Sequence, residues 1–362
     1  MREVSPFEVE SKELDYEKLI RQFGTQPISS LKKNLIPDHK IFRLGIAFSH
    51  RDFDKFMQAI KQGKKVAIVS GFQPSSGMHF GHLMTFQTNL FFQKKYGVEV
   101  FIPISDDETY VTRKVETQEQ ALENAKKIAA QIIALGFKKR LTKMFIDSQY
   151  TKIYNFAFKL SRGYTISLIK DAYGFTDSIN PGLMFYPCVQ AAHLLMPQLD
   201  EFGGPKHTLV LIGIDQDVYV RIARDIAEKF GFIRPGALHL KFLPGLKGGK
   251  MSGSKPETCI YLDDKIEEVE RKILNAFTGG QGNLEDQRKY GGNPNICVVF
   301  KYLATFFLNE KEMAEHERNC KSGKLMCGEC KQMLINKLKK FLREFQKKVK
   351  KAEEKIDKFL LG

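Results

Sequence analysis

The chain has 362 residues, 27% of them charged and 43% hydrophobic, a balance that excludes an intrinsically disordered chain and allows two or three globular domains. Its net charge of +15 suits a polyanionic partner such as RNA, although a merely basic, solvated surface accounts for it equally well. No apolar stretch approaches the length of a membrane span, and residues 1–8 lack the apolar core of a signal peptide, so a cytoplasmic protein is expected.

Strand and helix patterns alternate in the middle of the chain. Residues 1–64 lack this alternation and are interpreted as a short N-terminal extension. From residue 65 the pattern predicts an α/β fold with a Rossmann-like, doubly wound parallel sheet. The predicted elements are a strand at 66–69, a helix at 81–95 closed by Gly97, a strand at 98–104, a helix opened by a Thr117–Gln120 capping box and ended by Gly136, a strand at 209–212, and a helix at 218–230.

Helical patterns dominate from residue 259 to the end. The boundaries therefore predicted are 65–258 for a Rossmann-type catalytic domain and 259–362 for a helical C-terminal domain. Residues 331–362 carry eleven basic and four acidic residues, with the spacing of one long amphipathic helix that runs to Gly362. Its basic face either meets RNA or simply keeps the helix soluble, and the pattern is typical of both.

The loop after the first parallel strand carries a phosphate-binding pattern from Gly71 to His82. Open parallel sheets bind ligands at the carboxyl ends of their strands, where this loop lies. Gly81 lets the backbone approach a ligand, and the N-terminus of the following helix attracts phosphate. His79 and His82 can donate hydrogen bonds to phosphate oxygens as charge develops in a transition state. Because His-x-Gly-His also arises by chance, a pair of structural histidines is the alternative.

A second loop, about 170 residues further on, carries positive charge that would complement a bound phosphate. Residues 248–255 form a glycine-flanked segment with two lysines and two hydroxyl groups, which include Lys250, Ser252 and Ser254. Such a loop can close over a triphosphate, with Lys250 neutralising the departing pyrophosphate. Alone it could be an ordinary solvated loop. The two motifs in this order make coincidence a poor explanation and predict a site for a triphosphate.

These motifs resemble the His-Ile-Gly-His and Lys-Met-Ser-Lys-Ser signatures of the class I aminoacyl-tRNA synthetases. The departures are Phe80 for the isoleucine and Gly253 for the inner lysine. Residues 211–217 resemble the Gly-x-Asp-Gln segment of the tryptophanyl and tyrosyl members. Three further segments are similar to archaeal and eukaryotic tryptophanyl members, namely 105–108, 174–178 and 186–192. The resemblance implies activation of tryptophan by ATP with Mg²⁺, transfer to tRNA, and a homodimer.

The resemblance also implies roles for individual residues. Residues that would hold ATP are Gln73, His79, Gly81, His82, Asp215 (on the ribose) and Met251, with Lys250, Ser252 and Ser254 on the phosphates. Glu108, Gln190 and Gln216 would bind the ammonium and carboxylate of the amino acid. The helical domain would bind the anticodon arm, although Gln281 stands after Gly279-Gly280, where family members have an arginine.

The positions that read the side chain of the amino acid depart from the family. The Tyr and Gln with which eukaryotic members recognise the indole N–H are replaced by Val69 and Pro103, which leaves His193 and Gln198 as candidates. Tyrosyl members use a Tyr and an Asp at the positions of Val69 and His193, so a tyrosine enzyme is the second choice. Two alternatives come from other functional classes. A small adenylyltransferase would lack the helical domain, and a non-catalytic tRNA-binding paralogue would be expected to have lost motif residues.

Four of the six cysteines have a regular spacing, C-x22-C-x6-C-x2-C. Cys297, Cys320, Cys327 and Cys330 suit either structural zinc or an iron–sulfur cluster, and buried free thiols are the alternative. His316 could replace one ligand in a zinc site. Some bacterial tryptophanyl members carry a four-iron cluster with a resembling spacing, so the resemblance favours [4Fe–4S]. Cys188 and Cys259 lie in apolar segments and are expected in the core.

Overall fold

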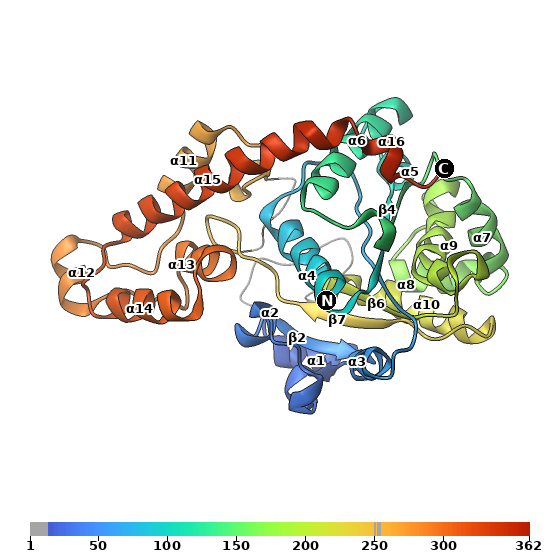
Figure 1. Cartoon of the computed structure of the whole chain (residues 1–362), viewed down its shortest axis with the longest axis horizontal. Coiled ribbons are helices and arrows are strands. Elements are labelled where there is room, and N and C mark those ends of the chain that lie inside the picture. The colour runs from blue at the N-terminus through green and yellow to red at the C-terminus, as the bar shows by residue number, and fades with distance from the viewer. Residues whose placement is uncertain (1–13, 250, 252–254) are drawn as a thin grey trace.

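The computed structural model describes residues 14–249, 251 and 255–362, and its centre is a seven-stranded sheet (Figure 1). The strands are β1 (Gln26–Pro27), β2 (Ala47–Arg51), β3 (Val66–Val69), β4 (Glu99–Ile104), β5 (Thr142–Ile146), β6 (His207–Gly213) and β7 (Gly236–Leu240). Their order is β1-β2-β7-β6-β3-β4-β5, and the five strands from β7 to β5 are parallel. This is the doubly wound order, with its switch point between β3 and β6, and it confirms the predicted α/β fold.

Helices cover both faces of the sheet, because each parallel strand alternates its side chains between two apolar layers. Ile68, Val100 and Ile102 face α4 and α6, whereas Val69, Phe101 and Phe145 face the layer of α7, α9 and α10. The helices of these layers are α4 (Phe80–Tyr96), α5 (Asp106–Val111), α6 (Gln118–Ala134), α7 (Lys152–Ser161), α8 (Ile166–Tyr173), α9 (Pro181–Leu195) and α10 (Asp217–Lys229). Thr117 caps α6 as predicted, by accepting from the backbone N–H of Gln120.

The first 64 residues are not separate from the sheet. β2 pairs antiparallel with β7, and β1 pairs antiparallel with β2, so both extend the sheet at its β7 edge. Helices α1 (Tyr16–Phe23), α2 (Lys40–Arg43) and α3 (Phe53–Lys61) accompany these strands. The sequence did not predict this pairing, because β1 and β2 are joined by short 3₁₀ and helical turns rather than by a regular alternation.

A helical arm extends from the sheet and then returns to it (Figure 1). It contains α11 (Ile266–Leu274), α12 (Leu284–Tyr290), α13 (Val298–Tyr302), α14 (Glu310–Lys321) and α15 (Cys327–Glu353). The prediction of one helix reaching Gly362 was wrong, since α15 ends at Glu353 and a turn leads to α16 (Ile356–Phe359). Leu361 then donates its N–H to the carbonyl of Met144, which ties the chain end to β5. In the described part of the chain, no helix is both long and apolar enough to cross a membrane.

Candidate active site

A cavity of about 780 Å³ opens at the carboxyl ends of β3, β4 and β6, on the face covered by α9 and α10. It lies at the switch point of the sheet, where the chain leaves β3 and β6 in opposite directions and a crevice results. The cavity is lined by Gln73 from the loop after β3, by Glu108 of α5, by Gln190 of α9 and by Gln216 after β6. The predicted amino-acid-binding residues thus lie around one space.

The loop after β3 is held against β4 by backbone hydrogen bonds. Phe72 donates its N–H to the carbonyl of Pro103 at 3.0 Å, and Ser105 donates to the carbonyl of Phe72 at 2.9 Å. Gln73 therefore reaches the cavity, where Lys114 donates to its side-chain oxygen at 2.5 Å. The loop ends at His79, which is the N-cap of α4.

His79 and His82 begin α4 in an unusual way, because imidazoles take the place of the usual serine or aspartate cap. Nδ1 of His79 accepts from the backbone N–H groups of Gly81 at 3.1 Å and His82 at 3.4 Å. Nδ1 of His82 accepts in return from the N–H of His79 at 3.3 Å. The rings stack with centroids 3.7 Å apart, and a Cβ on Gly81 would lie 2.9 Å from the His79 ring, so this position requires glycine.

These hydrogen bonds define the protonation of both rings. Burial lowers the pKa of His79 to about 4, and burial together with His79 lowers the pKa of His82 well below its usual value. Both imidazoles are therefore neutral at pH 7, with one proton each. Since each Nδ1 accepts, each proton resides on Nε2. The helix start thus carries two fixed Nε2–H donors and the positive end of its dipole.

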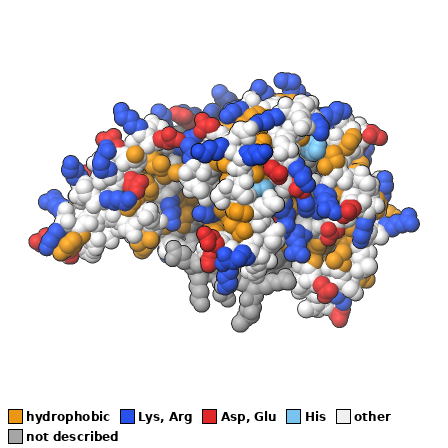
Figure 2. Space-filling view, turned by 90° about the horizontal axis from the view of Figure 1, so that it is seen from below, with side chains coloured by type: hydrophobic (Ala, Val, Ile, Leu, Met, Phe, Trp, Pro, Cys, Tyr) orange, Lys and Arg blue, Asp and Glu red, His pale blue; other side chains and the backbone are white. Residues whose placement is uncertain are grey.

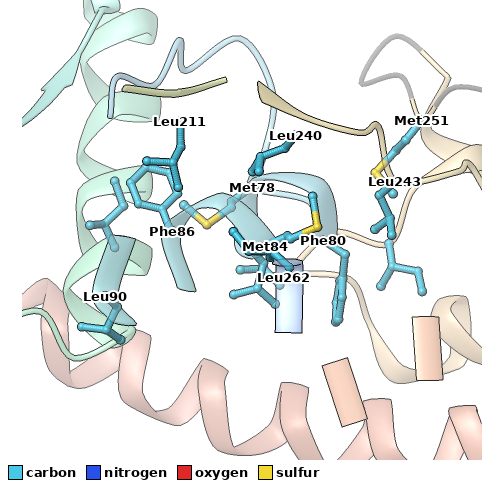
Figure 3. Packing of buried hydrophobic residues seen from close by; sticks show 14 of the residues in the cluster. Met78, Phe80, Met84, Phe86, Leu90, Leu211, Leu240, Leu243, Met251 and Leu262 are labelled. Atoms are coloured by element: carbon cyan, nitrogen blue, oxygen red, sulfur yellow. The ribbon is translucent and has the colours of Figure 1, made fainter. Parts of the chain in front are cut away.

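The described residues of the second motif lie beside the first motif. Lys250, Ser252 and Ser254 are outside the described residues, but Met251 is buried, and a Cβ on Gly81 would be 3.6 Å from its sulfur. Figure 3 shows Met251 next to Leu243, in the same apolar cluster as Phe80. The chain that follows pairs with the first loop, since Phe80 donates its N–H to the carbonyl of Ile260 and a bridge joins His79 to Tyr261. Two segments about 170 residues apart therefore converge at the start of α4.

Carboxyl and amide groups make the inner wall of the cavity polar. Burial raises the pKa of Glu108 to about 7, against the opposing effects of Lys114 and a hydrogen bond with Tyr186. The side-chain oxygen of Gln190 is buried and has no hydrogen-bond partner among the described residues. Gln216 donates to Asp215, whose side chain lies over Gly213 rather than in the cavity. A buried acid and an unpartnered amide oxygen fit a ligand that brings an ammonium group.

The residues considered for recognising the side chain of the amino acid differ in where they lie. Val69 and Pro103 line the cavity, and so does His193. Gln198 does not, because its amide is fully used by the backbone of Ile233, from which it accepts an N–H at 3.0 Å and to whose carbonyl it donates. The suggestion that Gln198 recognises an indole was therefore wrong, and this glutamine holds the loop before β7.

The sequence did not reveal a buried acid pair beneath the cavity. Asp107 follows β4, and Asp147 follows β5, a strand that the pattern did not predict. Burial raises the pKa of both carboxyls well above their usual range, and Asp147 raises that of Asp107 further. Tyr154 donates to Asp107 at 3.1 Å, and Asp147 meets Nε2 of His193 at 2.9 Å. The side chains of Asp107 and Ser105 lower the pKa of Asp147 against this effect of burial, so Asp147 is the more easily ionised acid of the two.

The four regularly spaced cysteines gather in the arm. Burial, with smaller contributions from the thiols of Cys320, Cys297 and Cys327, raises the pKa of Cys330 to about 12, so all four lie within electrostatic range. Cys330 also meets Nε2 of His316 at 3.3 Å. Among the described residues no three Cys, His, Asp or Glu side chains converge closely enough to form a site for a metal ion. Cys188 and Cys259 are buried in the core, as predicted.

Comparison with known proteins shows the family of this chain. Residues 61–343 match the family described as tRNA synthetases class I (W and Y). The chain is 43% identical to the tryptophan–tRNA ligase of Thermococcus onnurineus, over 98% of this chain and 93% of the relative. It is 41% identical to that of Methanocaldococcus jannaschii, over 100% and 99%. Its fold is similar to the crystal structure of tryptophanyl-tRNA synthetase from Aeropyrum pernix, with a TM-score of 0.88 and 35% identity over 96% of each chain.

Proposed function

The chain belongs to the class I tRNA synthetases of the tryptophan and tyrosine group, and from this we infer that it activates tryptophan with ATP and transfers it to tRNA. The reaction of the family uses ATP and Mg²⁺, and the Rossmann-like sheet described above is the fold on which it is carried out. The observation that carries the assignment is the identity of 38–43% to tryptophan–tRNA ligases over nearly the whole chain.

Tryptophan-dependent exchange of pyrophosphate into ATP, followed by charging of tRNA, tests the activity. Exchange with tryptophan at least about 100-fold more efficient than with tyrosine is expected. Exchange driven by tyrosine alone would make the chain a tyrosine enzyme instead. Absence of exchange with any amino acid, with tRNA binding retained, would identify the non-catalytic paralogue.

For the mechanism, the proposal assigns the Nε2–H groups of His79 and His82 to the α-phosphate side of the triphosphate. The carboxylate of the amino acid attacks the α-phosphorus, the bond to the departing pyrophosphate breaks, and the negative charge that grows there meets Lys250 and the second loop. Mg²⁺ would neutralise the remaining phosphate charge. No protein nucleophile is needed, because both steps depend on positioning and on fixed donors. Asp215, at the end of β6, is assigned to the ribose.

Recognition of the ammonium group by Glu108 predicts a pH dependence. Tryptophan binding needs the carboxylate, and the pKa of Glu108 in the free protein is about 7 because of burial. Below this pH the acid must lose a proton before it can bind, so the KM for tryptophan at pH 6 should be about tenfold above its value at pH 8. Exchange kinetics across pH 5.5–8.5 measure this. Glu108→Gln should raise KM at every pH and flatten the profile; an unchanged profile would show that another group titrates.

We assign the helical domain, residues 259–362, to the anticodon arm of tRNA. The support is its charge: Lys340, Arg343 and Lys347 are exposed at helical spacing on α15. Basic side chains are spread over the whole face of the molecule in Figure 2 and are not confined to this domain. Replacing these three residues by glutamine should raise the KM for tRNA by roughly tenfold and weaken its salt dependence, since fewer counterions are released. Pyrophosphate exchange should not change. The exposed Lys159→Gln on α7 is the control, and equal effects of the two changes would contradict the assignment.

A homodimer is also proposed. Phe158 on α7 and Ile166 on α8 are 75% and 63% exposed, although both are large apolar side chains on helices of the catalytic domain. An interface between two copies would remove this apolar surface from water. Light scattering should give twice the mass of the chain, and a monomeric mass at micromolar concentration would reject the dimer.

For the cysteines we propose a [4Fe–4S] cluster held by Cys297, Cys320, Cys327 and Cys330. Glycines let the backbone pass close to two of these thiols: a Cβ on Gly280 would lie 2.4 Å from the sulfur of Cys327, and one on Gly292 would lie 3.0 Å from that of Cys320. A single zinc ion needs its sulfurs within about 4 Å of one another, because Zn–S bonds are about 2.3 Å. In a [4Fe–4S] cluster the four cysteine thiolates would each hold one iron.

Anaerobic purification should therefore yield brown protein with about four iron atoms and acid-labile sulfide per chain. Cys320→Ser should abolish the colour, whereas Cys188→Ala, which removes a buried thiol far from the arm, should keep it. The family's chemistry at the adenylate site does not involve the cluster. Cys320→Ser should therefore reduce the rate of tRNA charging more than the rate of pyrophosphate exchange. Stoichiometric zinc without colour would replace the cluster by a zinc site, and protein free of both metals would reject the proposal.

A further inference from the structure

His193 stands at the inner end of the cavity, next to the position left apolar by Pro103. It lies on α9, one helical turn beyond Gln190, so both side chains face the cavity. Its ring centroid is 5.9 Å from that of Phe145, which pairs with Pro103 across β4 and β5. His193 is 4% exposed and more deeply placed than Gln190. Val69, Pro103 and Val210 add apolar side chains to the cavity lining, beside the polar Ser105 and Glu108.

The two nitrogens of the His193 ring have different roles. Nε2 meets Asp147 at 2.9 Å. Nδ1 makes no hydrogen bond to any residue that the structure describes, and it is not among the polar atoms sealed away from solvent. Because His193 lines the cavity, that open space is where Nδ1 is accessible. The ring is thus held at Nε2 by Asp147, whereas Nδ1 has no hydrogen-bond partner among the described residues.

Asp147 determines which nitrogen carries the proton. Burial raises its pKa, but the side chains of Asp107 and Ser105 act in the opposite direction, so Asp147 is the more easily ionised acid of the pair, and once ionised it can only accept from His193. Burial lowers the pKa of His193 to about 4, which leaves one proton on a neutral ring. That proton must reside on Nε2 to satisfy Asp147, and Nδ1 is therefore a bare acceptor. Tyr154 donates a hydrogen bond to Asp107, the other acid of the pair.

We propose that Nδ1 of His193 accepts the indole N–H of tryptophan and is the residue that selects this side chain. The proposal rests on tryptophan being the substrate, as inferred above. A buried acceptor in a cavity that also has apolar lining residues favours a flat aromatic ring with one N–H donor, and a ring without the donor leaves the acceptor unpaired. The ammonium and carboxylate remain with Glu108, Gln190 and Gln216, as proposed above. Asp147 acts as a positioning residue, since it holds the tautomer without touching the substrate.

The test compares tryptophan with 3-benzothienylalanine, in which sulfur replaces the indole N–H. The wild-type protein should prefer tryptophan by about 10–100-fold in kcat/KM for pyrophosphate exchange. His193→Leu should reduce this preference to about threefold or less by impairing tryptophan alone. Gln190→Leu, on the same face of α9, should impair both substrates and keep the preference. His193→Asn places an acceptor near the position of Nδ1 and should keep most of it.

Two outcomes would overturn the proposal: an undiminished preference in His193→Leu, or a preference lost in Gln190→Leu instead. Should His193→Leu fail to fold, ¹⁵N spectra of the wild-type protein give the answer. Tryptophan should move the Nδ1 resonance of His193 in the direction of hydrogen bonding, and 3-benzothienylalanine should not; equal shifts would reject the assignment. If wild-type protein does not activate tryptophan at all, the proposed function fails first, and that result is distinct from an active enzyme without discrimination.

Discussion

Replacing His79 or His82 by asparagine is expected to slow tryptophan activation by about 10²–10³-fold, the usual cost of losing one fixed donor to a developing negative charge. Asparagine keeps an acceptor near the position of Nδ1 and is a good helix N-cap, so it can still receive the N–H groups that begin α4. It lacks the Nε2–H group. The change therefore removes the proposed catalytic donor and leaves the helix start in place. Single-turnover formation of the adenylate measures the rate.

The matched variants His79→Gln and His82→Gln reverse this test. Glutamine can bring an N–H group near the position of Nε2 but reaches past the backbone donors, so it should recover part of the rate and lose part of the cap. We expect about 1 kcal/mol lower free energy of unfolding for Gln than for Asn at His79, since it caps α4. If Asn variants retain the wild-type rate, the two rings are only structural caps. The His-x-Gly-His pattern would then be the pair of structural histidines that is the alternative to a phosphate site.

The sequence predicted the parts of this site that depend on local pattern. The strand at 66–69, the glycine-rich loop and the helix after it follow one another, so the position of His79 at a helix start needed no tertiary information. The long helix opened by Thr117 was equally local. In contrast, β5 and β7 are five residues each and include Lys143 and His239, which interrupt the apolar run that a buried strand normally shows. Sheet pairing, rather than local propensity, makes them strands.

The same limit applies to side chains that act in pairs. Neither Asp147 nor Tyr154 belongs to a recognisable motif, and their connection to His193 exists only because β4, β5 and α9 meet. Gln198 was suggested for its polarity alone, and the structure uses that polarity for the backbone of Ile233. Val69 and Pro103, which the family resemblance placed at the side-chain-recognition positions, do line the cavity. The sequence offered His193 and Gln198 equally, and only the structure shows that His193 lines the cavity and Gln198 does not.

Asp217→Ala is expected to lower the free energy of unfolding by about 3–5 kcal/mol, the cost of removing one partner of a buried ion pair. Asp217 is fully buried at the start of α10 and accepts two hydrogen bonds from Arg51, both at 2.7 Å, and one from His239 at 3.0 Å. The alanine would leave the Arg51 guanidinium, 15% exposed, without its counter-charge. Because Arg51 also donates to the carbonyls of Phe23 and Gly24, the change should loosen α1 as well.

The consequence reaches the active site, because Asp217 follows Asp215 and Gln216 directly and fixes the turn that presents them. Burial would raise the pKa of Asp217, but the hydrogen bonds from Arg51 and His239 outweigh it and lower the pKa below its usual value. The stabilisation is therefore present above pH 4 and is lost as the pH falls through the lowered pKa. Urea denaturation of Asp217→Ala at pH 7 should show the full deficit, and the gap to wild type should close in acid. Asp225→Ala, exposed on the same helix, should stay within about 0.5 kcal/mol of wild type. If both variants lose the same small amount of free energy of unfolding, the Asp217–Arg51 ion pair contributes no more to stability than an exposed side chain on the same helix.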